Sequence, residues 1–277
     1  GQLWETVANR FTEMGGKILK NCKVEKILVD EDSNEVKSVV FNKNGRTMKI
    51  DADIFISSMP VKDLIDGISS DNIPPEVRNA AKTLPYRDFV TVGLLVNKLN
   101  LTNKTDYKTL SNIVPDCWIY VQDTGVKLGR IQIFNNWSPY MVSHPDNTVW
   151  LGLEYFCEEG DDFWNMEDGE CINFAVDELI KMGVISRNEV IDAHRERVKK
   201  AYPAYFDGYQ YMEYIVDYLN KFDNLYCVGR NGQHRYNNMD HSMATAFETV
   251  KDIISGTHDK TNIWNVNTEK EYHEEKK

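Results

Sequence analysis

The chain has 277 residues, 42% of them hydrophobic and 11% aromatic, which is enough to fill one large core or two ordinary ones. Its formal net charge of -11 argues against nucleic acid or an anionic membrane surface as a partner, because phosphate neutralisation needs clustered lysines and arginines. No run approaches the roughly 20 apolar residues that a membrane span requires, and residues 1–5 lack the pattern of a signal peptide.

The N-terminal part predicts a short amphipathic helix followed by strands. Leu3, Val7, Phe11 and Met14 recur at helical spacing, and Gly15-Gly16 follow as a stop signal. Residues 54–56 form a continuous apolar run that is typical of a buried parallel strand. Further strands are predicted at 17–19, 24–29, 36–41 and 48–52, with a hairpin turn at 42–45.

The middle of the chain, residues 61–217, predicts a mostly antiparallel sheet, because several of its segments are dense in β-branched and aromatic residues. Two short helices are expected before the sheet and a longer one, at about 168–182, after most of it. The helices before the sheet are predicted at 61–68 and 75–84, and the strands at 89–96, 118–121, 130–134 and 149–156.

The C-terminal part predicts a strand at 225–228 and then a helix whose single apolar stripe ends at Gly256. Residues 258–277 are expected to be a polar tail, ordered at most in part. The two flanking segments are predicted to pair as one domain, 1–60 with 218–257, and residues 61–217 to form a second, β-rich domain.

Several familiar motifs are missing from the sequence, which contains no GxGxxG, no Walker A loop and no HExxH. Five scattered cysteines without a CxxC pair predict reduced thiols in a cytoplasmic protein. His234 and His241 stand near Asp240, but an aspartate at a helix start beside two surface histidines is the commoner arrangement. We therefore predict no metal site.

Residues 225–246 carry the most specific pattern, a strand, a glycine turn, a polar loop and a helix with Asp240 as its expected N-cap. Gly229 and Gly232 let the backbone approach a ligand closely, and free N–H groups at a helix start hold electron-rich oxygens. An ordinary capped helix after a strand explains these features equally well.

The same stretch resembles the C-terminal flavin-binding motif of the FAD-dependent amine-oxidase-like flavoproteins, which include amine oxidases, protoporphyrinogen oxidases and UDP-galactopyranose mutases. The resemblance implies that Gly229 and Arg230 lie along the pyrophosphate and ribityl chain of FAD. It also implies that the helix start at Met239 and Asp240 points its amides at the flavin pyrimidine carbonyl.

Four other segments follow the order of that superfamily. Residues 1–16 are similar to its "glycine, helix, glycine" segment, and Val24 opens a Val-x-x-Ile motif whose valine backbone contacts adenine. Residues 52–60, which include Met59, resemble the strand and loop that pass near the cofactor. Residues 201–205 are similar to an Ala-x-Pro-x-Tyr element between the substrate domain and the flavin.

The resemblance implies an α/β fold, an incomplete FAD/NAD(P)-binding (Rossmann-like) domain with an inserted β-rich α+β substrate domain. The superfamily's GxGxxG βαβ unit would precede Gly1. We expect either that the chain is a fragment of a longer protein or that a partner chain supplies this unit. Of the two we favour the fragment. The chain alone is expected to bind FAD poorly or not at all and to be inactive.

The implied activity is hydride transfer from a small-molecule substrate to flavin N5. Two alternatives stay open, a mutase-like isomerase that uses reduced FAD and a flavin-free binding module. Arg130, Trp137, Tyr202 and Tyr205 are the candidate substrate-binding residues, each also plausible as core or surface. Acidic residues at 158–162 would attract a cationic substrate or form a solvated loop.

Overall fold

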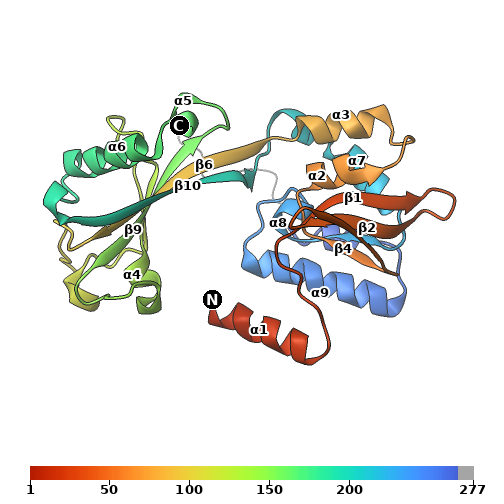
Figure 1. Cartoon of the computed structure of the whole chain (residues 1–277), viewed down its shortest axis with the longest axis horizontal. Helices are drawn as coiled ribbons and strands as arrows, with labels where there is room; N and C mark the ends of the chain where they lie inside the picture. The colour runs from red at the N-terminus through yellow and green to blue at the C-terminus, as the bar shows by residue number, and fades with distance from the viewer. Residues whose placement is uncertain (268–277) are drawn as a thin grey trace. The chain divides into compact units, whose positions relative to one another are not determined.

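The computed structural model describes residues 1–267, which form two compact units (Figure 1). Among the described residues, unit 1 joins 1–85 to 204–267, and unit 2 is the continuous segment 86–203. The predicted domain boundaries, 60/61 and 217/218, therefore lie inside unit 1. The reason is packing, because the helices on either side of those positions bury their apolar faces in unit 1.

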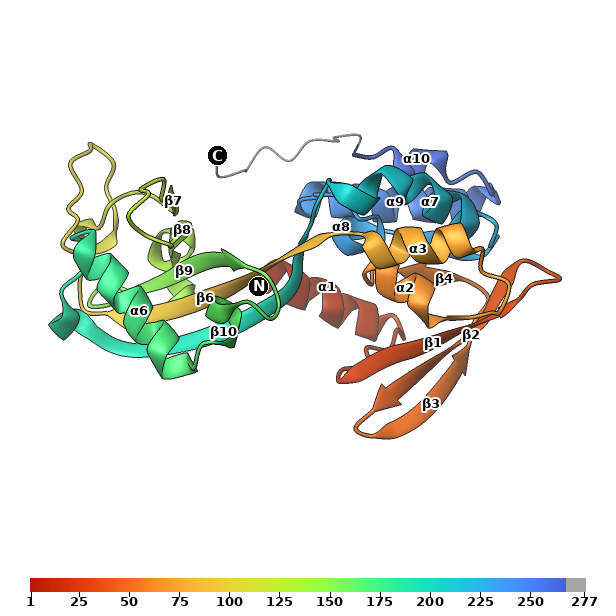
Figure 2. The ribbon, with the colours of Figure 1, turned by 90° about the horizontal axis from the view of Figure 1, so that it is seen from above.

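Unit 1 contains a four-stranded sheet in the order β3-β2-β1-β5 (Figure 2). The pairs β1–β2 and β2–β3 are antiparallel, and β5 runs parallel to β1. Asn44 and Gly45 both have positive φ, at 52° and 82°, as the two central residues of a tight hairpin turn require. The predicted hairpin is thereby confirmed. The strands are β1 (Cys22–Asp30), β2 (Glu35–Lys43), β3 (Arg46–Asp51) and β5 (Ile68–Ser69).

A second, two-stranded sheet in unit 1 joins segments that are far apart in the sequence. Strand β4 (Phe55–Ser57) runs parallel to β11 (Leu225–Cys227), with Phe55 opposite Leu225 and Ser57 opposite Cys227. Among the described residues, β4 has no partner on its other edge. The predicted strand at 54–56 is therefore present and parallel to its partner. The prediction that it is buried was wrong, because Ile56 is 51% exposed.

Helices surround these strands. In α2 the buried face consists of Val61, Leu64 and Ile65, and α3 contacts both α2 and α7. By contrast, α1 buries none of its residues. The helices of unit 1 are α1 (Gln2–Glu13), α2 (Val61–Gly67), α3 (Pro75–Thr83), η4 (Asp207–Tyr211), α7 (Met212–Asn220), α8 (Gly229–Gly232), α9 (Met239–Ser255) and α10 (Thr261–Trp264).

Unit 2 is built on a five-stranded antiparallel sheet in the order β10-β6-β9-β8-β7. Along β6, Val90, Val92, Leu94 and Val96 are buried while the residues between them are less so, which is the alternation of a strand with one core-facing side. Helix α6 adds Leu179 and its buried neighbours to this core. The strands are β6 (Tyr86–Val96), β7 (Trp118–Tyr120), β8 (Arg130–Ile133), β9 (Val149–Cys157) and β10 (Val190–Pro203).

The helical segments of unit 2 are short apart from α6, which matches the helix predicted at 168–182. They are η1 (Leu110–Asn112), α4 (Phe134–Trp137), η2 (Pro139–Met141), α5 (Asp162–Asn165), α6 (Asp168–Lys181) and η3 (Arg187–Glu189).

The predicted strand at 17–19 was wrong, since these residues form no strand. The strand β10 was not predicted. The segment from 258, which was expected to be ordered at most in part, contains α10 in its described part, with Ile263 only 1% exposed. At β10 and α10, contacts with distant residues outweighed the local pattern.

The packing of α8 on β4 requires a residue without a side chain at position 232. A β-carbon at this position would lie 2.7 Å from the Ser57 carbonyl oxygen, which is backbone and cannot rotate away. We expect Gly232→Ala to lower the free energy of unfolding by about 1–3 kcal/mol, measured by urea denaturation. Gly169→Ala is the control, because nothing lies within 4 Å of that added carbon. Equal stability of the two variants would contradict this packing.

Candidate functional site

The carboxyl ends of β4 and β11 lie side by side, and the chain after each strand enters the same region. The Val228 amide donates to the Ser57 carbonyl oxygen at 2.9 Å. Gly232, which is buried, brings α8 against Ser57 and Ser58. The carboxyl ends of parallel strands are a recurrent place for ligands in α/β proteins, so this edge is the candidate site.

Gly229 begins α8 in the left-handed conformation, with φ of 74°. Its amide donates to the buried Thr245 hydroxyl at 3.0 Å, which ties α8 to α9. A β-carbon at Gly229 would come no closer than 3.9 Å to another residue. Glycine is therefore favoured here by the backbone conformation, which side chains rarely adopt.

Helix α9 begins with a capping box, but its N-cap is Asn238 and not the predicted Asp240. The Asn238 side chain accepts from the His241 amide, and the Asn238 amide donates to His241 Nδ1. Asp240 is the second helical residue, with a largely exposed side chain. The amides of Met239 and Asp240 donate no hydrogen bond within residues 1–267. Such amides at the start of a 17-residue helix favour an electron-rich oxygen.

The loop between α8 and α9 orients Arg230. The Arg230 Nε donates to the Asn237 carbonyl oxygen at 2.9 Å, and the guanidinium carbon lies 4.6 Å from the centre of the Tyr236 ring. The Tyr236 amide donates in turn to the Tyr205 hydroxyl. Tyr205, predicted to bind substrate, thus belongs to unit 1 and supports the loop that orients Arg230.

Val24 and Met59 line one cavity of about 440 Å³ in unit 1. The two predicted cofactor residues come from β1 and from the loop after β4, so the fold brings them together. Apart from Ser57 and Ser58, the side chains that line the cavity are apolar. Its other lining residues are Ile27, Val36, Val39, Ile50, Ala52, Ile54, Phe55, Ile56, Ser57, Ser58, Leu64 and Leu225.

In unit 2, Arg130 is only 2% exposed and is enclosed by aromatic rings. Its guanidinium lies 4.8 Å from the Phe156 ring centre and 5.9 Å from that of Tyr202, and its Nη1 is 3.5 Å from a Glu154 oxygen. Glu154 also accepts from Gln132 at 2.6 Å. The structure therefore brings together the predicted residues Arg130 and Tyr202 around a buried ion pair.

Trp137, the remaining predicted substrate residue, is 51% exposed. Its ring meets the Trp118 ring edge-on, at 6.0 Å between centres. Trp118 also lies beside Arg130, at 5.4 Å, as does Tyr120, at 5.3 Å. An aromatic patch over β7 and α4 thus connects Trp137 to the Arg130 cluster.

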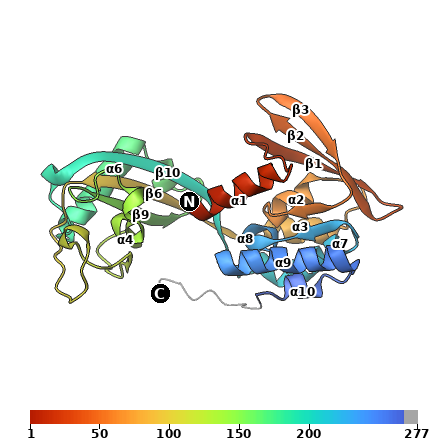
Figure 3. The same cartoon turned by 90° about the horizontal axis from the view of Figure 1, so that it is seen from below.

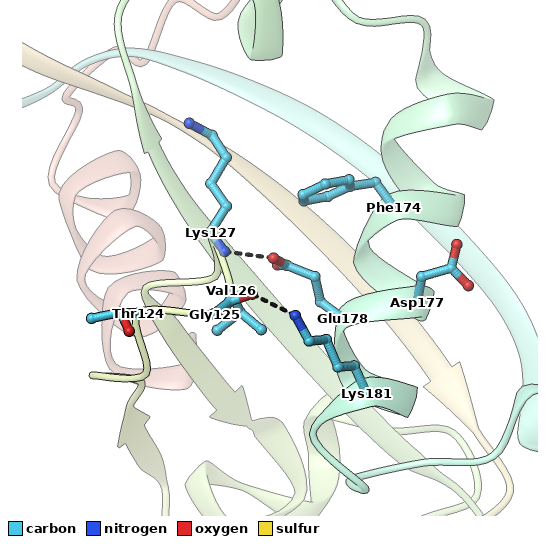
Figure 4. Close-up of a pocket in the computed structure, with 8 residues that line it drawn as sticks. All are labelled: Thr124, Gly125, Val126, Lys127, Phe174, Asp177, Glu178 and Lys181. Carbon is cyan, nitrogen blue, oxygen red and sulfur yellow. Dashed lines mark hydrogen bonds between the residues drawn. The ribbon is translucent and has the colours of Figure 1, made fainter.

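A separate pocket of about 520 Å³ lies between α6 and the loop before β8 (Figure 4). Its charged side chains serve local structure. Glu178 accepts from the Lys127 and Leu128 amides, and Lys181 donates to the Gly125 carbonyl oxygen at 2.8 Å (Figure 4). Because the Glu178 and Lys181 head groups hold the loop, we do not choose this pocket as the site.

The acidic run at 158–162 is a structured turn. The Asp161 side chain caps α5 by accepting from the Trp164 amide, and Glu159 pairs with Lys199. Within residues 1–267 no group of three potential ligands is placed to hold a metal ion. No helix in that range is both long and apolar enough to cross a bilayer.

Sequence reasoning missed the residues that support the site. Trp118 and Tyr120 are two residues apart in β7, so their side chains lie on the same face of the sheet, and this spacing was a signal that could have grouped them. Gln233, His234 and Asn237 lie in a polar loop with no periodicity, and their burial became visible only in the structure.

Several solved structures share this architecture. A reduced UDP-galactopyranose mutase matches 95% of this chain with a TM-score of 0.75 at 19% identity, over 52% of its own chain. A putrescine oxidase bound to putrescine matches 90% of this chain with a TM-score of 0.60 at 16% identity, over 52% of its own chain. A putative protoporphyrinogen oxidase from Exiguobacterium matches 82% of this chain with a TM-score of 0.55 at 12% identity, over 46% of its own chain. The chain has the fold of the FAD-dependent amine-oxidase-like flavoproteins.

The chain spans about half the length of each of these solved structures. No family model and no curated protein matches the sequence. The residues at the carboxyl ends of β4 and β11 fit part of a flavin cofactor, because the open amides of α9 suit an electron-rich carbonyl oxygen. A GxGxxG pyrophosphate loop is not in the sequence.

The loop that orients Arg230 contains the buried His234, which makes the stability of the fold depend on pH. Burial, aided by the nearby Arg235 and Lys62 charges, lowers the pKa of His234 from 6.5 to about 4, although its hydrogen bond to the Ala204 carbonyl oxygen acts the other way. Below pH 6.5 the unfolded chain binds a proton that the folded chain excludes. Stability is therefore lost as the pH falls from about 6.5 towards 4.

We expect the free energy of unfolding contributed by His234 to drop by about 2 kcal/mol between pH 7 and pH 5. His234→Asn removes the titration and suits the left-handed backbone, since φ is 48° there. Urea midpoints of this variant should depend less on pH than those of the wild type and of His194→Asn, an exposed control. An unchanged pH dependence in His234→Asn would contradict the assignment.

Proposed function

We propose that this chain is part of an FAD-dependent oxidoreductase in which unit 1 binds the flavin and unit 2 contributes to the substrate site. The observation that carries the proposal is the pair of open amides at the start of α9, beside the ends of β4 and β11 and the Arg230 loop. Bound FAD would supply a hydride acceptor for oxidation of a small molecule.

In this proposal each cofactor residue has a defined task. The amides of Met239 and Asp240 stabilise negative charge on an oxygen of the flavin. Gly229 keeps the backbone free of a side chain, and Arg230 pairs with the phosphates through charge-assisted hydrogen bonds. Val24 and Met59 provide apolar contact from the cavity that they share.

Unit 2 is proposed to bind the substrate through its aromatic cluster. Trp137 offers an exposed ring, while the buried Arg130 and Tyr202 hold the surrounding rings in place. Tyr205 belongs to unit 1 and contributes indirectly, because its hydroxyl accepts from the Tyr236 amide in the loop before α9. The five free cysteines are consistent with a proposed location in the reducing cytoplasm.

We further propose that additional polypeptide covers part of unit 1. The open edge of β4 is flanked by Ile54 and Ile56, which are 43% and 51% exposed, and α1 also leaves its apolar side chains exposed. Exposed apolar surface beside an unpaired strand edge is typical of an interface. A GxGxxG βαβ unit, from the same polypeptide or from a partner chain, is the proposed occupant, and FAD would bind weakly without it.

A mutase-like isomerase is the second candidate, favoured by the 0.75 TM-score of the match to the reduced mutase over 95% of this chain. Arg130, Tyr202 and Tyr205 would then serve the diphosphate of a nucleotide sugar. The buried ion pair of Arg130 with Glu154 argues against this role, because the carboxylate already neutralises the guanidinium.

The proposed role of Arg230 predicts a selective loss of cofactor. In the protein expressed from its complete gene, Arg230→Ala should weaken FAD binding by about 10-fold or more, the value of one or two charge-assisted hydrogen bonds. The melting temperature of the FAD-free protein should change little. Arg78→Ala is the matched control, since it is an exposed arginine of unit 1 whose guanidinium donates to the Ser70 carbonyl oxygen. Unchanged FAD affinity in Arg230→Ala would contradict the proposed contact between Arg230 and the phosphates.

The two candidate chemistries predict different fates for the flavin. With an oxidase, substrate added without oxygen bleaches the oxidised flavin, and an electron acceptor restores its absorbance; small amines, including putrescine, are the first compounds to try. For the rival, dithionite-reduced protein is mixed with UDP-galactopyranose and with UDP-galactofuranose, and the products are separated. We expect bleaching and no interconversion. Interconversion with no net flavin oxidation would establish the mutase instead.

A further inference from the structure

The last described residues of the chain, 258–267, are built into unit 1 despite their polar sequence. Helix α10 lies beside α9 (Figure 2, Figure 3). Lys260 is only 4% exposed, and its ammonium donates to the Phe222 carbonyl oxygen at 2.5 Å. The Trp264 indole donates to the Asn220 side chain at 3.0 Å. This segment is therefore anchored before it reaches the candidate site.

Three buried amide side chains join this segment to the loop that precedes α9. Asn267 Nδ2 donates to Asn237 Oδ1 at 2.9 Å, and Asn237 Nδ2 donates to Gln233 Oε1 at 3.3 Å. Gln233 Nε2 returns to the segment by donating to the Ile263 carbonyl oxygen at 2.9 Å. Each of the three side chains belongs to a residue that is at most 3% exposed. A partner removed from such a network leaves buried polar groups unsatisfied.

The network ends on the two residues that orient Arg230. The Asn237 carbonyl oxygen accepts from Arg230 Nε, and the Tyr236 ring lies against the guanidinium. Asn267 Nδ2 contacts both residues, since it also reaches the Tyr236 carbonyl oxygen at 3.4 Å. The side chain of Asn267 is thus two contacts away from Arg230.

We propose that Asn267 is a positioning residue for Arg230. By holding Asn237 and Tyr236, it fixes the loop at 233–238 in the arrangement in which the guanidinium is presented to an anionic ligand. The inference rests on the proposed function where it identifies that anion as the phosphates of FAD. The effect on the loop itself is independent of any cofactor.

The test uses Asn267→Ala in the protein expressed from its complete gene. Asn262→Ala is the matched control, because Asn262 lies in the same segment but bonds Glu248 and Asp252 on α9. Without cofactor, hydrogen exchange at the amides of residues 234–238 should be about tenfold faster in Asn267→Ala than in the control. The amides of β6 in unit 2 serve as the internal reference for overall folding. Equal exchange of the loop in both variants would overturn the inference.

A double-mutant cycle on FAD affinity separates positioning from a general loss of stability. Asn267→Ala should weaken FAD binding by about tenfold when Arg230 is present and should have little further effect in Arg230→Ala. Additive losses would show that Asn267 does not act through Arg230. Faster loop exchange in a protein that binds no FAD would support the positioning role and refute the proposed function, so the two failures are distinguishable.

Discussion

The parallel pairing of β4 with β11 is the constraint on which the candidate site depends. It joins two segments that are distant in the sequence, and it brings the loop after Ser57 next to Gly229. Gly232 is needed at this junction because the backbones of α8 and the end of β4 leave no room for a side chain. The start of α9 is placed by the same junction, since the Gly229 amide is bonded to Thr245 on that helix. A single backbone pairing therefore brings the proposed cofactor residues of the two segments together.

Around this junction, several polar side chains are buried, and their hydrogen bonds orient neighbouring groups. Gln233, Asn237 and Asn267 are enclosed amides whose hydrogen bonds connect the end of β11, the loop before α9 and the last described segment. Buried amides of this kind specify one arrangement because every alternative leaves a donor or an acceptor without a partner. Unit 1 consequently combines a loop held by buried hydrogen bonds with an exposed helix start, the two features on which the proposed anion site depends.

Unit 2 differs, because its core is a sheet with apolar alternation in which two buried arginines have hydrogen-bond partners. Arg130 with Glu154, and Arg195 with the Phe163 and Trp164 carbonyl oxygens, are buried cations that organise their surroundings. Such groups explain how β10, a strand with a highly charged sequence, belongs to the sheet. Its charged side chains lie on the exposed side or find partners across the unit. Several aromatic rings lie against the same cation, while Tyr120 and Trp137 are each about half exposed, at 53% and 51%.

The sequence by itself determined the amphipathic helices α6 and α9, the hairpin at Asn44-Gly45 and the parallel strand β4, because periodicity and turn chemistry are local properties. It also placed Gly229, Arg230, Met239 and Asp240 on one strand-loop-helix stretch. Only the tertiary structure decided that Val24 and Met59 share a cavity, that Tyr205 belongs with the Arg230 loop and that Asn238 caps α9. The boundaries of the units, the strand β10 and the burial of residues 260–267 were decided there as well. These features arise from contacts between distant residues, whose free energy outweighs the weak local preferences that a sequence displays.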